Sequence, residues 1–544
     1  MNISDAVTLS ILWTRLQSVV DEAATVLLRT AFSTIVRESG DMTVLLTDVR
    51  GTTVAQTRKG VGSLGPAIGT TVRAVLQDFP VETWTPGDVV LTNDPWIAAG
   101  HTGDVVTVRP FFWSSRCLGF IAVAAHVPDI GGRLAPSDAK EVYEEGIIFP
   151  PTHLLRGDEV VTQVARLLEK NVRVADQVMG DIFAQVSCAK LCEQRLSQLM
   201  QEYDLDQLAP LFDAILARSE HAVRDTIASL PDGTYSADVV TDGVDTPLTI
   251  RATVRIAGDE MDVDYAGTSA QVAAGINSVL NYTRAYSFYT LKCILDPHGP
   301  NNDGSMRPVR VSAPEGSLLN ARFPAPVYAR SQSGHYLGSV LMSALAPVAP
   351  DRVIAACGSP SNRTVFNGRR SDGKRYSFLL FTSGGFGARS NSDGLACTPF
   401  PSNTGSPPVE VMERETGLVV LEKSLASDSG GRGRYRGGLG MRLRIENPLR
   451  ESVRLSIRMD RMSNGASGLF AGGDGGCSDL RLNGKTDGIR PKGESELKPG
   501  DVITIVTPGG GGYGAPAERD ALADAKDMEA GYVTDIAETI DAKR

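Results

Sequence analysis

Glycine is distributed unevenly along this chain, and the distribution limits how its C-terminal third can fold. The sequence has 56 glycines in 544 residues. Glycine permits tight turns and lets one backbone approach another closely. Between about Leu418 and Tyr513, strand-like segments alternate with glycine turns, which predicts a β-barrel or a sandwich. The glycine pairs and runs are Gly384-Gly385, Gly430-Gly431, Gly437-Gly438, Gly472-Gly473, Gly475-Gly476 and Gly509 to Gly512.

The N-terminal part of the chain mixes helical and strand periodicity. Apolar residues recur at helical spacing over residues 4–37, and Ser4-Asp5 offers an N-cap. A second helix is expected over residues 64–76, where Gly65-Pro66 opens it. Segments that are dense in β-branched and aromatic residues predict strands at 42–48, 54–56, 88–92, 104–112 and 118–125.

Further along, the apolar period changes twice. It is helical over residues 158–230 and switches to two at Gly233, which predicts antiparallel strands up to residue 265. Helices are then expected over residues 279–294 and 334–345. The patterns together predict an α+β, mixed multidomain fold. Its expected parts are an N-terminal α/β region (1–157), a helical layer (158–232), a mixed α/β region (233–417), a Gly-rich β domain (418–516) and a peripheral helical tail (517–544).

Composition argues against several classes of protein. The formal net charge is −10 and no basic stripe is present, so nucleic-acid binding is not expected. No run of about twenty apolar residues indicates a membrane helix, and the N-terminus lacks the pattern of a signal peptide. The seven cysteines are odd in number and scattered, which does not suit a disulfide framework. A cytoplasmic location is therefore expected.

Two loops that follow or precede strand-like segments carry a histidine and an aspartate at the same spacing. The first reads His101-Thr102-Gly103-Asp104 and the second His126-Val127-Pro128-Asp129. A His-x-x-Asp pair offers an imidazole nitrogen and a carboxylate oxygen from one turn, which suits zinc, manganese or iron. For each pair the alternative is a turn in which the aspartate caps a backbone N–H. If the two loops converge, the sequence predicts a metal centre.

These loops and other motifs along nearly the whole chain resemble the hydantoinase B family. That family includes the B-type subunits of ATP-dependent hydantoinases, the matching half of 5-oxoprolinase, and subunits of acetone and acetophenone carboxylases. The matching segments are Arg37 to Asp41, Asn93 to Asp104, Ala125 to Gly132, Glu141 to Pro151, Asn302 to Gly304, Pro314 to Ser317, Pro324 to Val327, Arg434 to Gly438 and Thr507 to Gly514.

The resemblance implies one divalent metal ion, zinc or manganese, in this chain. Carried over by motif position, the implied ligands are Glu38, His101, Asp104 and His126. Asp41 would then lie nearby as a candidate general base. Asp129 would accept a hydrogen bond from a ligand histidine. The chain departs from the usual loop at Ala98-Ala99, where glycines are common, and at Gly103, where proline is common.

The resemblance also implies a partner. We find no ATP-binding signature in this sequence, and the family supplies one through an A-type, actin-like ATPase subunit that uses ATP and Mg. A hetero-oligomer that opens a small cyclic amide, such as a hydantoin, 5-oxoproline or another lactam, is therefore expected. Phosphorylation of the carbonyl oxygen would activate the amide, and the metal would lower the pKa of a bound water toward about 7.

Several alternatives remain open at this point. The chain could serve a ketone carboxylase, hold a structural metal while the partner does the chemistry, or hydrolyse its substrate alone without ATP. Thr507 to Gly514 lacks the Gly-Lys-Ser/Thr of a nucleotide loop, which favours a turn cluster. The arginines of Gly431 to Gly438 could bind a phosphate or line a turn. Glu145 is either a surface charge or a pocket residue.

Overall fold

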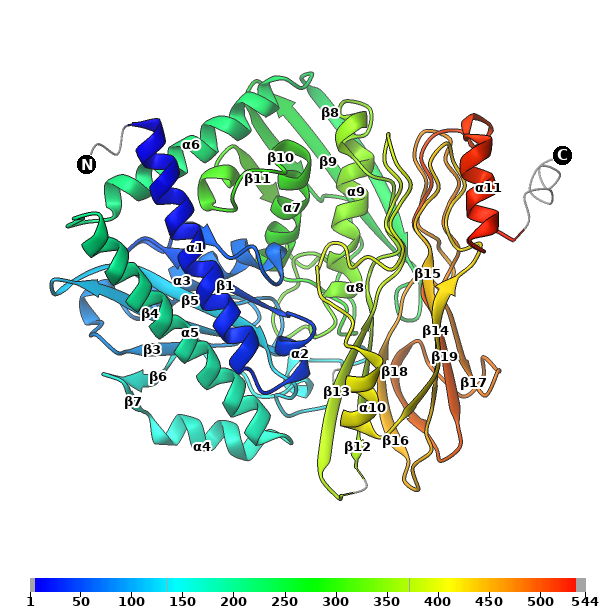
Figure 1. Cartoon of the computed structure of the whole chain (residues 1–544), viewed down its shortest axis with the longest axis horizontal. Coiled ribbons are helices and arrows are strands. Elements are labelled where there is room, and N and C mark those ends of the chain that lie inside the picture. Colours follow the sequence, from blue (N-terminus) through cyan, green and yellow to red (C-terminus); the bar gives the residue numbers. More distant parts are fainter. Residues whose placement is uncertain (1–4, 135, 371, 535–544) are drawn as a thin grey trace. The chain divides into compact units, whose positions relative to one another are not determined.

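The computed structural model describes residues 5–134, 136–370 and 372–534. Contacts between Cα atoms divide it into two compact units, which are described separately below. The first unit runs to Thr234 and includes Thr253–Arg330 and Ser402–Pro407. The second unit comprises the rest of the described chain. Helices and strands of both units are shown in Figure 1. The structure confirms the mixed α+β class.

The first unit is built on a seven-stranded antiparallel sheet with the order β2-β1-β5-β4-β3-β6-β7. The strands predicted at 42–48, 54–56, 88–92, 104–112 and 118–125 are all present. β4 and β5 form a long hairpin at its centre, and β1 flanks β5. The bounds are β1 (Met42–Thr47), β2 (Thr53–Gln56), β3 (Val89–Thr92), β4 (Asp104–Trp113), β5 (Arg116–His126), β6 (Thr152–Arg156) and β7 (Glu159–Val160).

Helices α1 and α5 cover one face of this sheet (Figure 1). Asp5 caps α1 by accepting a hydrogen bond from the Thr8 amide at 2.8 Å. Leu12 and Leu16 of α1 share one buried core with Val44 of β1, because helical spacing aligns them on one face. The bounds are α1 (Ala6–Thr30), α4 (Thr162–Asn171), α5 (Ala175–Glu202) and α6 (Ala209–Ala228).

The single helix predicted over residues 4–37 is wrong at its C-terminal end. α1 stops at Thr30, and α2 (Thr34–Arg37) is a separate turn. The break occurs where the buried Asp181 carboxylate accepts hydrogen bonds from the amides of Phe32 and Ser33. A long-range side chain therefore satisfies backbone donors that a continuous helix would have paired.

The opposite face of the large sheet is covered by α3 (Gly65–Asp78), which also packs against α7 (Leu280–Leu295). A smaller sheet follows with the order β11-β10-β9-β8, in which β10 and β11 are parallel. Residues 235–252 of its β8–β9 hairpin are counted with the second unit. The bounds are β8 (Gly233–Thr241), β9 (Leu248–Ala257), β10 (Glu260–Asp264) and β11 (Val309–Ser312).

Two four-stranded sheets dominate the second unit, with the orders β13-β12-β16-β18 and β14-β15-β19-β17. Side chains from both sheets form one buried core, so they pack face to face as a sandwich, and the described residues form no closed barrel. The sandwich begins before residue 418, because β12 pairs with β16. The strands are β12 (Asn362–Arg369), β13 (Arg375–Thr382), β14 (Val419–Ala426), β15 (Gly440–Glu446), β16 (Val453–Arg458), β17 (Asp479–Leu482), β18 (Lys492–Leu497) and β19 (Val502–Val506).

Helices of the second unit are short. The helix predicted over residues 334–345 is present as α9, and the predicted helical tail contains α11, with residues 535–544 outside the described chain. Among the described residues, none of the helices combines the length and apolar character that a membrane crossing requires. The bounds are α8 (Ser331–Gly334), α9 (Tyr336–Leu345), α10 (Val409–Thr416) and α11 (Ala521–Glu529).

Glycine-rich segments of the second unit pack against one another through their backbones. We call Gly509–Gly512 and the glycine segments around it the glycine bundle. Gly510 N donates to Gly438 O at 2.9 Å, and Gly512 N donates to Gly473 O at 2.9 Å. A Cβ atom on Gly437 would lie 1.9 Å from Gly510 O, so no side chain fits there. The predicted close approach of backbones is confirmed, and these amides are already used within the fold.

Arg436, in the arginine-rich turn, binds protein carboxylates. Its guanidinium is buried and donates to both oxygens of Asp527 on α11, at 2.8 and 3.1 Å. Arg519 also pairs with Asp527 and with Asp393. Of the two interpretations left open by the sequence, the structure favours a turn that anchors α11 over a phosphate site, because Arg436 is already neutralised.

Candidate metal centre

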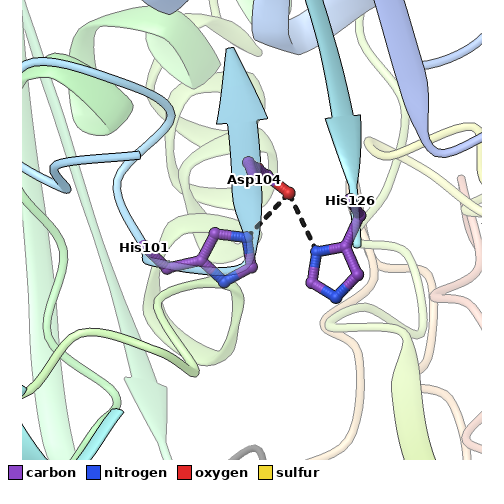
Figure 2. Close-up of side chains that lie close together, drawn as sticks. All are labelled: His101, Asp104 and His126. Carbon is purple, nitrogen blue, oxygen red and sulfur yellow. Dashed lines mark hydrogen bonds and ion pairs between the residues drawn. The ribbon is translucent and has the colours of Figure 1, made fainter. Parts of the chain in front are cut away.

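Three buried side chains converge where β4 begins and β5 ends. Asp104 is the first residue of β4, His126 is the last of β5, and the two are register partners. Directly opposed residues of an antiparallel pair project from the same face of the sheet. His101 approaches from the loop before β4 (Figure 2). Ligand atoms from the three residues lie within 4.8 Å of one another.

Both imidazoles point at one carboxylate oxygen. Asp104 Oδ1 lies 2.8 Å from His101 Nε2 and 2.8 Å from His126 Nδ1, as Figure 2 shows. The three residues expose 3% of their surface or less. Burial of this kind is costly for polar groups unless they are hydrogen-bonded or bind an ion. The cluster therefore needs hydrogen bonds or a bound ion to offset the cost of its burial.

A backbone carbonyl orients His101. Its Nδ1 lies 3.1 Å from Tyr328 O, so Nδ1–H is the donor and Nε2 keeps its lone pair. That buried Nε2 has no hydrogen bond of acceptable geometry among the described residues. A buried imidazole nitrogen that keeps its lone pair beside a carboxylate is in the form that binds a divalent cation. The donor set of two imidazoles and one carboxylate fits a divalent cation.

The electrostatics favour the protonation states that a cation requires. Burial, together with the cationic Arg330, holds the pKa of His101 well below its usual value, so the imidazole is neutral at neutral pH. Burial alone would raise the pKa of Asp104, but the Arg330 guanidinium and the hydrogen bond from His126 outweigh it and hold that pKa well below its usual value. Asp104 is therefore ionised. Neutral imidazole and ionised carboxylate are the metal-binding forms.

Arg330 holds the second oxygen of Asp104. Its Nη2 donates to Asp104 Oδ2 at 2.7 Å, and its Nε donates to Ala99 O at 2.6 Å. The guanidinium also stacks over the Tyr282 ring at 4.3 Å. Since Oδ2 is occupied, Asp104 presents Oδ1 alone to the two histidines. No spacing in the sequence reveals this residue, because 226 positions separate Arg330 from Asp104.

Glu145 supports the segment that orients His101. Its Oε1 accepts hydrogen bonds from the amides of Val327 and Tyr328, at 2.7 and 2.8 Å. Burial raises the pKa of Glu145 to about 8, so its carboxyl group is protonated at neutral pH. Its Oε2 has no hydrogen-bond partner among the described residues. Glu145 is thus a buried residue behind the cluster and not a surface charge.

Gly103 leaves room for both histidine rings. A Cβ atom at this position would lie 2.7 Å from His126 Cε1 and 3.2 Å from His101 Cε1. Ala98 and Ala99, the other departure from the usual loop, are completely buried. Gly103 therefore lets the two imidazoles approach the shared carboxylate.

Comparison with known proteins agrees with the pattern of motifs. The family described as hydantoinase B/oxoprolinase matches residues 5–516. The chain belongs to this family. It is 32% identical to the B-type subunit of a putative D-/L-hydantoinase from Pseudomonas sp. (strain NS671), over 97% of this chain and 93% of the relative.

Two solved structures resemble this member of the hydantoinase B/oxoprolinase family. The crystal structure of ATP-dependent caprolactamase from Pseudomonas jessenii matches with a TM-score of 0.90 and 26% identity, over 98% of this chain and 95% of that one. Nucleotide-free acetone carboxylase matches with a TM-score of 0.86 and 18% identity, over 97% and 78% of the two chains. The second likeness is one of fold alone.

Asp41 lies beside the cluster. Its carbonyl accepts a hydrogen bond from the His126 amide at 3.0 Å, and the next residue, Met42, is the register partner of Ala125. This register places Asp41 on the sheet face of His126 and Asp104. Asp41 is buried, with 6% of its surface exposed. The backbone of Asp41 therefore lies next to His126, and its role as a base stays a prediction.

The other two predicted residues are engaged elsewhere. Glu38 is not part of the converging group, because its carboxylate is partly exposed and accepts from Arg37 Nε at 2.9 Å. Both oxygens of Asp129 accept hydrogen bonds from Arg173. The acceptor expected for a histidine N–H is therefore the Tyr328 carbonyl and not Asp129. Ligation by Glu38 stays a prediction.

Proposed function

We propose that this chain is the metal-containing subunit of an ATP-dependent enzyme that hydrolyses a cyclic amide, such as a hydantoin, 5-oxoproline or another lactam. The observation that carries the proposal is the convergence of His101, Asp104 and His126 in a member of the hydantoinase B/oxoprolinase family. A hydantoinase subunit and a caprolactamase are among its relatives. Hydantoins and caprolactam share a ring amide, which is the bond we expect this enzyme to cleave.

The residues present suit a zinc or manganese ion, since both accept a mixture of imidazole and carboxylate. When bound, such an ion supplies Lewis acidity beside the amide that is to be cleaved. His101 and His126 would hold it through neutral imidazoles and Asp104 through Oδ1. Glu38 would join as a fourth ligand only after leaving Arg37.

The protein groups around the cluster have their own tasks. The Tyr328 carbonyl keeps the Nε2 lone pair of His101 directed at the site. Arg330 fixes the rotamer of Asp104 and excludes water from its second oxygen. Asp41 would take a proton from the attacking water at a carboxylate oxygen and return it to the departing amide nitrogen. Asp129 would act only indirectly, by holding its loop through Arg173.

An unactivated amide is a poor electrophile, so we assign its activation to a partner. An A-type ATPase subunit, using ATP and Mg, would phosphorylate the carbonyl oxygen before ring opening. Ring opening by one water would then leave an acyl phosphate, which a second water would hydrolyse to the carboxylate and inorganic phosphate. The hydantoinase relative is by name one subunit of a larger enzyme, which supports a hetero-oligomer. The alternative, a subunit of an ATP-dependent ketone carboxylase, is supported by likeness of fold to acetone carboxylase.

The test is a turnover assay with the A-type subunit and this chain expressed together. ADP release and ring opening are measured with hydantoins, 5-oxoproline and caprolactam, and in parallel with ketones plus bicarbonate. We expect turnover with at least one cyclic amide, dependent on ATP and on both subunits. Turnover with ketones alone would reject the proposal in favour of a carboxylase. Activity of this chain alone without ATP would show that the reaction needs no ATPase subunit, and would reject that part of the proposal.

A variant separates catalysis in this chain from a purely structural metal. Asp41→Asn keeps the size of the side chain and removes its basicity. With the metal content unchanged, we expect the turnover number to fall by about a hundredfold or more. Full activity of this variant would favour a structural metal, with the chemistry done in the partner.

A further inference from the structure

A cavity of about 570 Å³ lies in the first unit, at the end of α7 away from the metal cluster. Its wall comes from α1, the loop after β2, α7 and residues 297–301. Tyr282, near the start of α7, stacks on Arg330, whereas Tyr289 and Lys292 line the cavity. Ten residues of helix separate Tyr282 from Lys292, which corresponds to about 15 Å. The cavity is therefore a site distinct from the cluster.

The charge of the cavity wall has one sign. Among the described residues that line it, Arg58, Arg218 and Lys292 are cationic and none is an aspartate or glutamate. In a chain with a formal net charge of −10 this distribution is unusual. A wall lined by positive charge without acids raises the local concentration of anions.

Two of these cations are already neutralised by carboxylates behind the wall. Arg58 Nη2 pairs with Asp21 at 2.8 Å, and Lys292 Nζ pairs with Asp296 at 2.5 Å. Arg218, on α6, forms no ion pair or hydrogen bond among the described residues. The wall therefore offers about one uncompensated positive charge, which suits a monoanion better than a phosphate dianion.

The size of the cavity and the aromatic part of its wall leave room for an apolar body on the anion. A bare carboxylate would fill a small part of 570 Å³, and cavities of about 300–1,000 Å³ typically hold small organic molecules. Trp13 and Tyr289 contribute aromatic surface, and Pro297 and Pro300 add further apolar surface. Asn301, which has no hydrogen-bond partner among the described residues, adds an amide donor to the same wall.

We propose that this cavity binds a small organic monocarboxylate, with its carboxylate on the Arg218 guanidinium and its apolar body against Trp13 and Tyr289. Binding at this site does not depend on the hydrolysis of a cyclic amide. Ring opening of a cyclic amide does release a carboxylate. A hydantoin would give a carbamoyl amino acid, which is a monocarboxylate like this ligand, whereas a lactam would give an amino acid that also carries an ammonium group.

The experiment is calorimetric titration of the full chain, without metal and without partner, with three probes. Hexanoate has the charge and the apolar body, hexanamide has the body alone, and inorganic phosphate has the charge alone. We expect hexanoate to bind with a Kd of about 1 mM. Hexanamide is expected to bind at least about tenfold more weakly, because it forms no ion pair. Phosphate is expected to give no saturable heat.

Two substitutions of Arg218 test whether its positive charge binds the carboxylate of the ligand. Arg218→Gln is expected to weaken hexanoate binding by about tenfold and to leave hexanamide unchanged. Arg218→Lys keeps the charge and is expected to retain most of the affinity. The matched control is Arg166→Gln, which removes another exposed helical arginine of this unit that has no ion pair among the described residues. Thermal unfolding of each variant checks that it is folded.

The proposal is overturned if hexanoate and hexanamide bind equally, or if Arg218→Gln and Arg166→Gln have the same effect. Tighter binding of phosphate than of hexanoate would reject the monocarboxylate class. Absence of saturable heat with hexanoate up to about 50 mM would reject the site itself. If Arg218→Gln does not fold, the comparison between the wild type and Arg218→Lys decides, since loss of binding in a variant that keeps the positive charge contradicts the proposal.

Discussion

Around His101, Asp104 and His126, buried side chains are brought together at the ends of two strands, whereas in the glycine bundle backbones pack so closely that a Cβ atom does not fit at Gly437. The Asp104 carboxylate contacts His101, His126 and Arg330, and burial of these polar and charged groups is costly unless they are paired. Around Gly510 the neighbours are backbone amides and carbonyls that satisfy one another. Buried ionisable side chains define the first region, and close backbone packing defines the second.

The difference teaches where substitutions should act. A change in the cluster removes a ligand or its support and should lower metal affinity with little loss of stability, because the sheet beneath it remains. A change in the bundle forces backbones apart and should lower stability with no effect on metal affinity until the second unit unfolds. Four predictions test this separation.

The largest effect is expected when a side chain is added to a glycine of the glycine bundle. Gly437→Ala places a Cβ atom 1.9 Å from Gly510 O, so the free energy of unfolding should fall by about 3 kcal/mol. Gly476→Ala is the control, since its nearest atom would be Ser429 Cα at 3.2 Å. Urea unfolding measures both. Equal stability of the two variants would contradict the packing account.

Loss of a ligand should give the next largest effect. His126→Ala is expected to weaken binding of zinc or manganese by about a hundredfold or more, because it removes a proposed ligand from the buried site. His221→Ala, which removes an exposed histidine from the same unit, should bind metal like the wild type. Competition with a coloured chelator measures the affinity. An unchanged affinity in His126→Ala would place the metal elsewhere.

The pH dependence of the free energy of unfolding should reveal the protonation of Glu145. Burial raises the pKa of Glu145 to about 8, so the folded protein keeps a proton that the unfolded chain releases above about pH 4.3. The free energy of unfolding should therefore fall as pH rises from 5 to 6.5, by about 2 kcal/mol. Glu145→Gln should remove this fall, and Glu144→Gln should not, because the pKa of Glu144 is lowered. The same slope in both variants would contradict the assignment.

The smallest effect is expected from a substitution of Arg330, which donates to the second carboxylate oxygen of Asp104. Arg330→Lys keeps the charge but loses the planar fork that reaches Asp104 and Ala99 together. Metal affinity should fall by about tenfold, while Arg173→Lys, at the pair with Asp129, should leave it unchanged. If the two lysine variants bind metal equally, Arg330 does not position the carboxylate.

Periodicity and motif spacing predicted much of this molecule. The strands that carry Asp104 and His126 follow from their β-branched composition, and the histidine loops from their spacing of three. The glycine pairs predicted close backbone contacts in a β-rich region, and the structure has them. These signals are local, so they can be read from neighbouring residues in the sequence.

The contacts that complete the cluster could not be predicted, because they join distant segments. Arg330 and Tyr328 lie more than two hundred residues after His101 and act through a guanidinium and a backbone carbonyl. The break at Thr30 depends on Asp181, which belongs to another helix. Glu38 and Asp129 stand at motif positions, but their carboxylates are taken by Arg37 and Arg173. Motif spacing identifies which residue types are available for a site, but it does not show which other side chains bind them in the folded protein.

The central claim is that His101, Asp104 and His126 hold one divalent ion that the reaction needs. The most direct test is elemental analysis of the purified, active pair of subunits, with turnover measured on the same sample before and after chelation. The account predicts about one zinc or manganese per chain, and loss of turnover that the metal restores. Full turnover by a preparation that contains no bound cation would contradict it.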